Sequence, residues 1–174
     1  MPSLTRIKWT ERTFNFDFPA GLYPELIERL RGTPARVTDR LTGIPLNILN
    51  RRHNNAWSIL ENAGHLADLD AGLFLVRLDE FERGVDALQP ADMTNRGTEE
   101  ANHNLKSLEQ ILHFCRTARA GLVHRLEACD PALFARSAYH PRLKVPMRLA
   151  DMMYFQAEHD DHHLATISEI LRSA

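Results

Sequence analysis

Apolar side chains recur at helical spacing through several long stretches of this sequence, and no stretch alternates strongly enough to predict a sheet. The clearest stretch is residues 147–172. Its inward stripe, at intervals of three or four residues, consists of Met152, Gln156, His159, His163, Ile167 and Ile170. Such a stripe is the face that a helix turns toward the core of a bundle. The sequence therefore predicts an all-α fold.

The N-terminal part of the chain predicts an irregular segment followed by a kinked helix. Residues 1–21 are expected to be irregular, because aromatic and polar side chains alternate in "WTERTFNFDFPAG" and the segment contains no long apolar run. A helix is expected over residues 23–42, with a kink near Gly32. Glycine suits a helix C-terminus, Thr33 suits an N-cap, and Pro34 suits the first position of the next helical segment.

Two more helices are expected in the middle of the chain. Ser58 and Glu61 form a capping box, which predicts a helix over about residues 58–83. A further helix is expected over about residues 98–129. Together with the final helix, these segments predict one domain over residues 1–174, a four-helix bundle whose loop lengths leave its connectivity open.

The composition argues against several classes of partner. Lys+Arg number 21 and Asp+Glu 23, with no basic cluster that could follow a phosphate backbone, so nucleic acid is not expected. No apolar run approaches the roughly 18 residues of a membrane span, and the N-terminus lacks a signal-peptide core. Cys115 and Cys129 lie too far apart on one expected helix for a disulfide. Reduced thiols predict a cytoplasmic protein.

His159 and His163 are one helical turn apart, so their rings lie on one face and can share a metal ion. Burying polar groups without partners costs roughly 1–3 kcal/mol each, which favours a compensating ligand. On the expected helix over residues 58–83, His65 also faces inward, on a stripe with Leu69, Leu73 and Val76. The three imidazoles predict a divalent metal site; the alternative is that they are hydrogen-bonded core residues.

Neighbouring polar residues are candidates for supporting roles. His162, at the rim of the pair, and Glu158 are candidate catalytic general bases. Glu158 or Asp68 could also orient an imidazole. Asp160 and Asp161 are expected on the solvated face of the helix.

Two residues outside the final helix are candidates for the pocket that binds a cofactor or substrate. His103 could form a pocket wall or a weak fourth ligand, and a surface position is the alternative. Arg142, in the loop before the last helix, could meet a substrate carboxylate, although ordinary turn chemistry also explains this loop.

Four stretches together resemble the DinB-like (DinB/YfiT) superfamily of helical-bundle metalloproteins: "WSILENAGHLADL", "TNRGTEEANHN", "HPRLKVPMRLADMMYF" and "AEHDDHHLATI". The resemblance extends from about Tyr23 to the end of the chain. It implies a four-helix bundle that binds one divalent metal through His65, His159 and His163. It also implies a homodimer and, as in several relatives, a transferase that uses a low-molecular-weight thiol such as bacillithiol or mycothiol.

Three neutral imidazoles leave the fourth position of a zinc ion open, as in catalytic sites. Nitrogen ligands favour zinc, with nickel or iron as alternatives. The first functional hypothesis is a transferase in which the metal holds a small thiol as thiolate and presents it to an electrophilic substrate. The alternatives are a metal-dependent hydrolase and a non-enzymatic metal-binding or stress-related protein.

Overall fold

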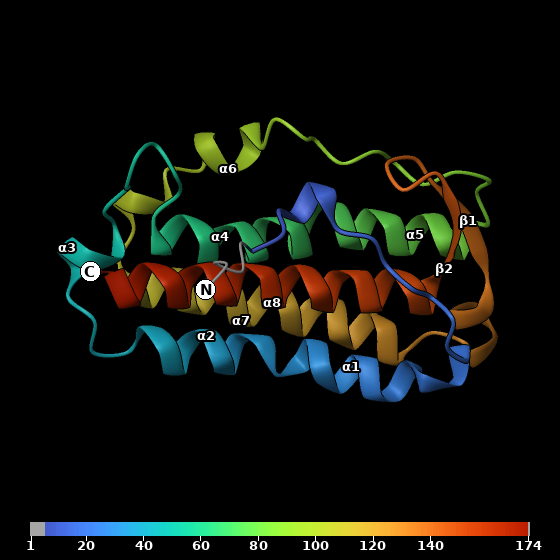
Figure 1. Ribbon diagram of the computed structural model, residues 1–174. Helices are drawn as coiled ribbons and strands as arrows, with labels where there is room; N and C mark the ends of the chain where they lie inside the picture. The colour runs from blue at the N-terminus through green and yellow to red at the C-terminus, as the bar shows by residue number, and fades with distance from the viewer. Residues whose placement is uncertain (1–5, 174) are drawn as a thin grey trace.

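The structure, a computed structural model that describes residues 6–173, consists mainly of helices (Figure 1). The α-helices are α1 (Tyr23–Arg31), α2 (Thr33–Leu41), α3 (Leu46–Leu49), α4 (Ile59–Leu69), α5 (Leu75–Arg83), α6 (Arg96–Glu100), α7 (Leu108–Glu127) and α8 (Leu149–Ser173). The short turns are η1 (Trp9–Glu11), η2 (Ala20–Leu22), the π-helix η3 (Asp70–Phe74), η4 (His103–Leu105) and η5 (Pro131–Ala135). A hairpin consists of β1 (Ser137–His140) and β2 (Val145–Arg148).

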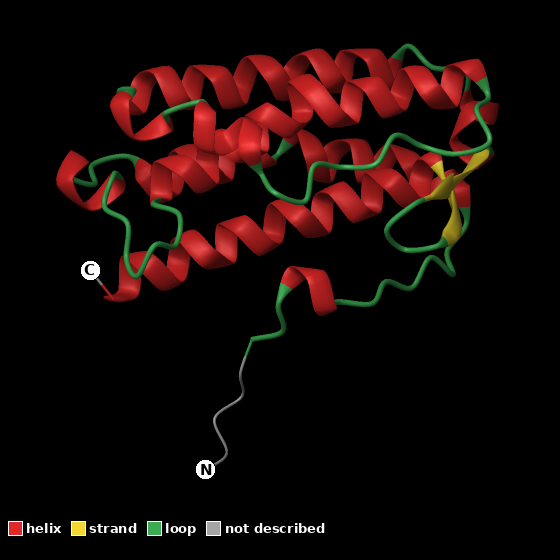
Figure 2. Ribbon diagram, turned by 90° about the horizontal axis from the view of Figure 1, so that it is seen from above, coloured by secondary structure: helices red, strands yellow, loops and turns green. Residues whose placement is uncertain are grey.

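The long helices pack lengthwise against one another (Figures 1 and 2). Helix α4 contacts both α7 and α8, and α1 and α2 also contact both of these helices. The α4–α5 stretch and the α1–α2 stretch therefore lie on opposite sides of α7 and α8. This arrangement brings α4 against α8, the two helices that carry the inward-facing histidines.

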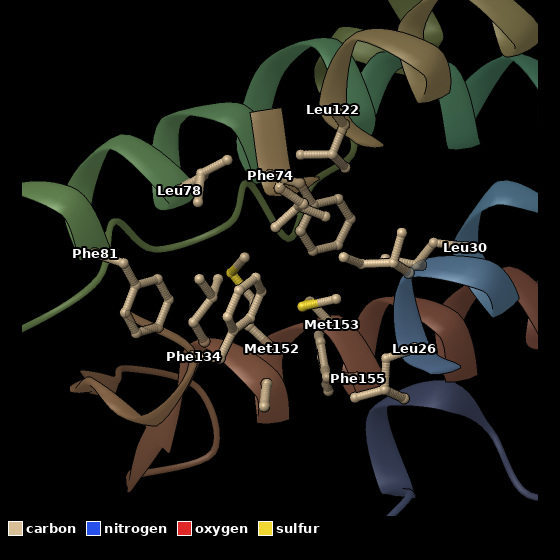
Figure 3. Close-up of a cluster of buried hydrophobic side chains, with 14 of the residues drawn as sticks. Leu26, Leu30, Phe74, Leu78, Phe81, Leu122, Phe134, Met152, Met153 and Phe155 are labelled. Atoms are coloured by element: carbon tan, nitrogen blue, oxygen red, sulfur yellow. The ribbon is translucent and has the colours of Figure 1, made fainter. Parts of the chain in front are cut away.

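Two apolar clusters form the core. One contains side chains of α1, α5, α7, the hairpin and the first half of α8; Figure 3 shows its centre, with Leu26, Leu30, Phe74, Leu78, Phe81, Leu122, Phe134, Met152, Met153 and Phe155. The other contains side chains of α2, α4, the first half of α7 and the end of α8. Buried polar residues of α4, α7 and α8, among them His65, Arg119 and His159, belong to neither cluster. Within residues 6–173, no helix combines the length and apolar character needed to cross a bilayer.

The N-terminal arm consists of α1 and α2 with Gly32 between them. Residues 1–5 of the expected irregular segment lie outside the described residues, and the rest of that segment contains only the turns η1 and η2. It runs beside α8 (Figure 2). The expected N-cap role of Thr33 is wrong: Thr33 is helical, and its hydroxyl donates to Asp160 at 2.7 Å.

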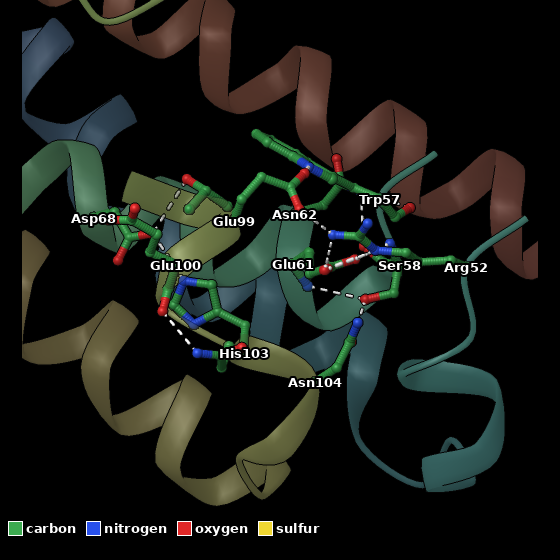
Figure 4. Close-up of polar contacts among 12 residues, drawn as sticks. Arg52, Trp57, Ser58, Glu61, Asn62, Asp68, Glu99, Glu100, His103 and Asn104 are labelled. Carbon is green, nitrogen blue, oxygen red and sulfur yellow. Dashed lines mark hydrogen bonds and ion pairs between the residues drawn. The ribbon is translucent and has the colours of Figure 1, made fainter. Parts of the chain in front are cut away.

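The predicted capping box at the start of α4 is confirmed. The Ser58 hydroxyl accepts from the Glu61 amide, and the Glu61 carboxylate accepts from the Ser58 amide (Figure 4). The helical stretch that follows is not uniform, because the π-helix η3 inserts a wider turn between α4 and α5. Beyond this turn the buried face shifts to Phe74 and Leu78, and Leu73 is left half-buried at the side.

The expected helix over residues 98–129 is wrong at its start. Asn102 adopts a left-handed backbone conformation with φ of 53°, which ends any helix begun at Thr98. The long helix α7 instead begins after Ser107, which forms a second capping box with Gln110. Thr98 belongs to the short α6, which packs against α4.

The expectation of no sheet is also wrong at one place. Strands β1 and β2 pair antiparallel at one end of the bundle, with His140 opposite Val145 (Figure 2). Lys144 turns the chain with a positive φ of 57°. The pair is too short for its alternation to stand out in the sequence. The hairpin holds the loop that contains Arg142 beside α8, where Arg142 packs against Phe155.

Candidate metal centre

The structure brings His65 of α4 together with His159 and His163 of α8. One ring nitrogen of each residue lies within 4.8 Å of the corresponding nitrogens of the other two, and all three side chains are buried. Nε2 of His159 is 3.1 Å from Nε2 of His163. The i, i+4 spacing on α8 and the contact between α4 and α8 produce this convergence.

A chain of hydrogen bonds sets the tautomer of His65. Lys106 can only donate, so Nδ1 of His103 accepts from it at 3.2 Å, and Nε2 of His103 donates to Asp68 at 2.8 Å. The Thr98 hydroxyl donates to the same carboxylate oxygen at 3.3 Å. Because the Thr98 hydroxyl gives its hydrogen to Asp68, the Thr98 oxygen accepts from Nδ1–H of His65 at 2.8 Å. Nε2 of His65 therefore keeps its lone pair for a ligand.

Asn62 sets the tautomer of His163 in the same way. The Asn62 amide nitrogen donates to the backbone carbonyls of Ser58 at 2.8 Å and Trp57 at 3.3 Å. Its side-chain oxygen is thus left to accept from Nδ1–H of His163 at 2.8 Å. Nε2 of His163 also keeps its lone pair, as a metal ligand requires.

Burial keeps these imidazoles neutral. Desolvation lowers the pKa of His65 to about 4, and it holds the pKa values of His159 and His163 well below the ordinary range. The neighbouring histidines lower all three pKa values further. Neutral imidazoles bind divalent ions without first losing a proton.

These residues fit a divalent ion. Zinc–nitrogen bonds of about 2.0–2.1 Å place two ligands of a tetrahedral site about 3.3 Å apart, close to the 3.1 Å between His159 and His163. Nδ1 of His159 is buried without a hydrogen-bond partner within the part of the chain that the structure describes. A proton on this nitrogen is compatible with ligation through Nε2.

A cavity of about 250 Å³ adjoins the three histidines. It is lined by the three histidines themselves, by His140, His162, Arg77 and Arg142, and by apolar side chains that include Trp9, Trp57, Leu69, Leu73, Phe74 and Phe155. A larger and more open depression of about 850 Å³ lies between α2 and α7, but its lining contains no imidazole. The smaller cavity is therefore the candidate site.

Residues 29–167 match the DinB superfamily. The chain belongs to the DinB superfamily. The resemblance that the sequence suggested is thereby confirmed. Comparison with curated proteins gives no match.

Two solved structures are similar to this DinB superfamily member. YfiT from Bacillus subtilis, described as a probable metal-dependent hydrolase with an unusual four-helix bundle topology, is 19% identical, with 93% of each chain covered and a TM-score of 0.78. The mycothiol-dependent maleylpyruvate isomerase is 11% identical, with 88% of this chain and 62% of that chain covered and a TM-score of 0.67. At these identities the likeness establishes the fold alone.

The two candidate bases lie in different surroundings. His162 lines the cavity, and its Nδ1 is 2.9 Å from Nη2 of Arg6. Desolvation, with the charges of Arg6 and Arg12, lowers the pKa of His162 to about 4. Glu158 does not line the cavity; its carboxylate pairs with Arg29 at 2.7 Å and with Arg12, which keeps its pKa low despite partial burial.

His103 and Asp68 support the site from behind His65. His103 is fully buried, outside the cavity lining, and its ring packs against Gly64 of α4. A Cβ at Gly64 would lie 2.4 Å from that ring, so the glycine makes the close approach possible. The Asp68 carboxylate accepts from both His103 and Thr98. Figure 4 shows Asp68 and His103. His103 thus lies behind the three-histidine cluster.

The expectation of a solvated Asp160 is wrong. Its carboxylate is buried and accepts from Arg119 at 2.7 and 3.0 Å, while Asp70 accepts from the same guanidinium at 2.7 Å. Gln156 also donates to Asp70, at 2.6 Å. The sequence did not mark Arg119 of α7 as a buried partner of these carboxylates. The one available signal was its position on the inward face of α7. Asp161 is partly exposed and pairs with Arg29 and Arg36.

Sequence reasoning also missed the side chains that enclose the cavity and orient the histidines. Trp9 contacts His159, with ring centroids 5.0 Å apart, and Trp57 contacts His65 at 4.8 Å. Asn62 lies one turn before His65 on α4, and that spacing was a usable signal. Trp9 lies in a segment without helical periodicity, so nothing local placed it here.

Proposed function

We propose that this DinB superfamily protein binds one divalent metal ion through His65, His159 and His163 and catalyses transfer of a small thiol to an electrophilic substrate. The observation that carries the proposal is the convergence of three neutral imidazoles, two of which have their tautomers set by hydrogen bonds. Zinc is the preferred ion because the ligands are all nitrogen, with nickel and iron as alternatives.

An ion held there would supply a Lewis acid that lowers the pKa of a bound thiol or water. The chain itself contributes the orientation of the ligands. Thr98 and Asn62 hold the rings of His65 and His163, and the two tryptophans add apolar surface to the cavity wall.

The nucleophile in this proposal comes from outside the chain. Among the described residues that line the cavity, no cysteine or serine occurs and Thr10 supplies the one hydroxyl. Cys115 lies elsewhere in the core, donates to the carbonyl of Ala63, and has a pKa raised to about 12 by burial. Such a thiol is a packing residue, since the thiolate is the reactive form.

A thiol is favoured over water by the state of the candidate bases. A hydrolase gains from a group that accepts a proton from the attacking water, although a water bound to the metal needs that group less. Glu158 is committed to Arg12 and Arg29, and His162 lies against Arg6. A thiol that binds the metal as thiolate has already lost its proton, so the transfer step needs no base. The similarity to a mycothiol-dependent isomerase agrees with this preference.

Hydrolysis is the second candidate, because the similar YfiT is described as a probable metal-dependent hydrolase. In that reaction His162, which lines the cavity, is the candidate general base. A metal-binding role without catalysis is the remaining alternative.

The experiment that separates these functions is calorimetric titration of the zinc-loaded protein with bacillithiol, mycothiol and glutathione. Saturable binding of one thiol that disappears in His163→Gln supports the transferase. Zinc binding without any thiol binding contradicts it and favours hydrolysis or a non-enzymatic role, which turnover of model esters then separates. A homodimer and a cytoplasmic location remain predictions, and the mass in solution tests the first.

A further inference from the structure

We propose that the substrate of this cavity carries a carboxylate group and that Arg142 binds it. The inference rests on the proposed function, because it takes the cavity beside the three histidines as the substrate site. It adds the chemical class of the substrate, which the histidines alone leave open.

Arg142 lines the cavity without a carboxylate partner among the described residues. Its guanidinium lies 5.5 Å from the ring centroid of Trp9 and 5.2 Å from that of Phe155, both of which also line the cavity. The rings hold the guanidinium by cation–π contacts, yet its Nη2 is buried and has no hydrogen-bond acceptor within residues 6–173. A buried donor on a charged group without an acceptor is costly, and a ligand oxygen would remove that cost.

A second guanidinium adds to the positive charge of the same cavity. Arg77 is buried, and its nitrogens contact the Gln89 carbonyl at 2.9 and 3.1 Å and Nε2 of His140 at 3.2 Å, all neutral partners. Burial lowers the pKa of Arg77 to about 10, so it stays charged at neutral pH. Two arginines thus face one small space.

Acidic groups do not balance this charge within the cavity lining that the structure describes. Asp92 is the one carboxylate there, and it accepts from the hydroxyl and amide of Thr94 and from the amide of Arg96. Glu80 is the carboxylate whose charge raises the pKa of Arg77, but Glu80 does not line the cavity. The cavity therefore favours an anion.

The size and walls of the cavity restrict the anion further. A volume of about 250 Å³ equals roughly eight waters and lies below the usual range for ligand pockets. Leucine, phenylalanine and tryptophan side chains form much of its wall. These features suit a small acid with an apolar body, and a guanidinium forms paired hydrogen bonds with the planar carboxylate.

The test uses cyclohexanecarboxylate as the probe, with cyclohexanecarboxamide as its neutral counterpart and cyclohexyl phosphate as the competing anion. The chain has two tryptophans, Trp9 and Trp57, and both line the cavity, so their fluorescence reports occupancy. The probes do not absorb where tryptophan is excited. Titrations are made on the full chain after removal of metal with a chelator, so that metal ligation cannot hold the acid.

We expect the carboxylate to bind and the carboxamide to bind at least about tenfold more weakly. Arg142→Gln should weaken carboxylate binding by about 10- to 100-fold, as loss of hydrogen bonds to a charged group implies. Arg142→Lys should retain part of the affinity. Arg83→Gln, which removes an exposed arginine of α5, is the matched control and should bind like the wild type.

Equal affinity for acid and amide, or unchanged affinity in Arg142→Gln with native circular dichroism, overturns the inference. Tighter binding of the phosphate than of the carboxylate overturns the assignment of the substrate class. Because the titration is made without metal, its result is valid whether or not the three histidines bind a metal ion. Metal content is measured separately, so the failure of either proposal is recognised on its own.

Discussion

Nε2 of His159 lies 3.1 Å from Nε2 of His163, one turn along α8. The two residues meet His65 of α4 in a buried cluster, and different residues orient the rings: Asn62 for His163, and Thr98 for His65. The cluster is therefore built from α6 and the start of α4 as well as from the histidines.

Thr98→Val removes the oxygen that accepts from Nδ1 of His65 while keeping the shape of the side chain. Loss of such a partner usually weakens metal binding, and we expect zinc affinity to fall about 10- to 100-fold. Competition with a metallochromic chelator measures it. Thr117→Val on the exposed face of α7 is the control. Equal zinc affinity in Thr98→Val and the wild type would show that Thr98 does not orient His65.

Gly64→Ala places a Cβ 2.4 Å from the His103 ring. His103 must move, and overpacking of this kind costs about 1–3 kcal/mol of unfolding free energy. Urea denaturation measures the loss. The control is Gly121→Ala, where nothing lies within 4 Å of the new Cβ and the helix should gain about 0.5–1 kcal/mol. Similar effects of the two substitutions would contradict the close packing of His103.

Arg119→Met leaves the carboxylates of Asp70 and Asp160 buried without their shared cation. Breaking a buried ion pair from one side costs about 3–5 kcal/mol, so the variant should be severely destabilised. Denaturant midpoints give the comparison. Arg125→Met, on the same helix with exposed partners, should change stability by at most about 1 kcal/mol. If both variants were equally stable, the buried network would contribute nothing to the fold.

Acidification should lower the stability of the protein. Desolvation, with the charges of Arg77 and Arg142, lowers the pKa of His140 to about 4 from 6.5. As the pH falls, the unfolded state therefore binds a proton before the folded state does. The stability that His140 contributes is fully present above pH 6.5 and is lost as the pH falls toward 4. Tm at pH 5 should therefore lie below Tm at pH 7. His140→Gln should reduce this difference, and an unchanged difference would exclude His140 as a source.

The sequence predicted those parts of the fold that depend on local chemistry. The Ser58–Glu61 capping box and the i, i+4 spacing of His159 and His163 act within one or two turns of helix, and both are where the sequence places them. The contact between α4 and α8 depends on topology, which local spacing does not specify. That contact was predicted by the resemblance to the DinB superfamily.

The missed features depend on contacts between distant segments. Nothing near Asp160 marks it as buried, because its partner Arg119 lies 41 residues away on α7. Trp9 encloses the site from a segment without periodicity, and the π-helix shifts the inward face of the α4–α5 stretch without a distinctive residue. Asn102 interrupts the expected third helix by adopting a conformation that asparagine tolerates but does not require.

The central claim is that one divalent ion binds to the three histidines. Elemental analysis of protein purified without a histidine tag or a metal column tests it most directly. We predict about one equivalent of zinc, nickel or iron per chain in the wild type and in His113→Gln, an exposed control on α7. His65→Gln and His163→Gln should each lose most of it. Unchanged metal content in these two variants, or a wild-type protein that takes up no metal, would contradict the account.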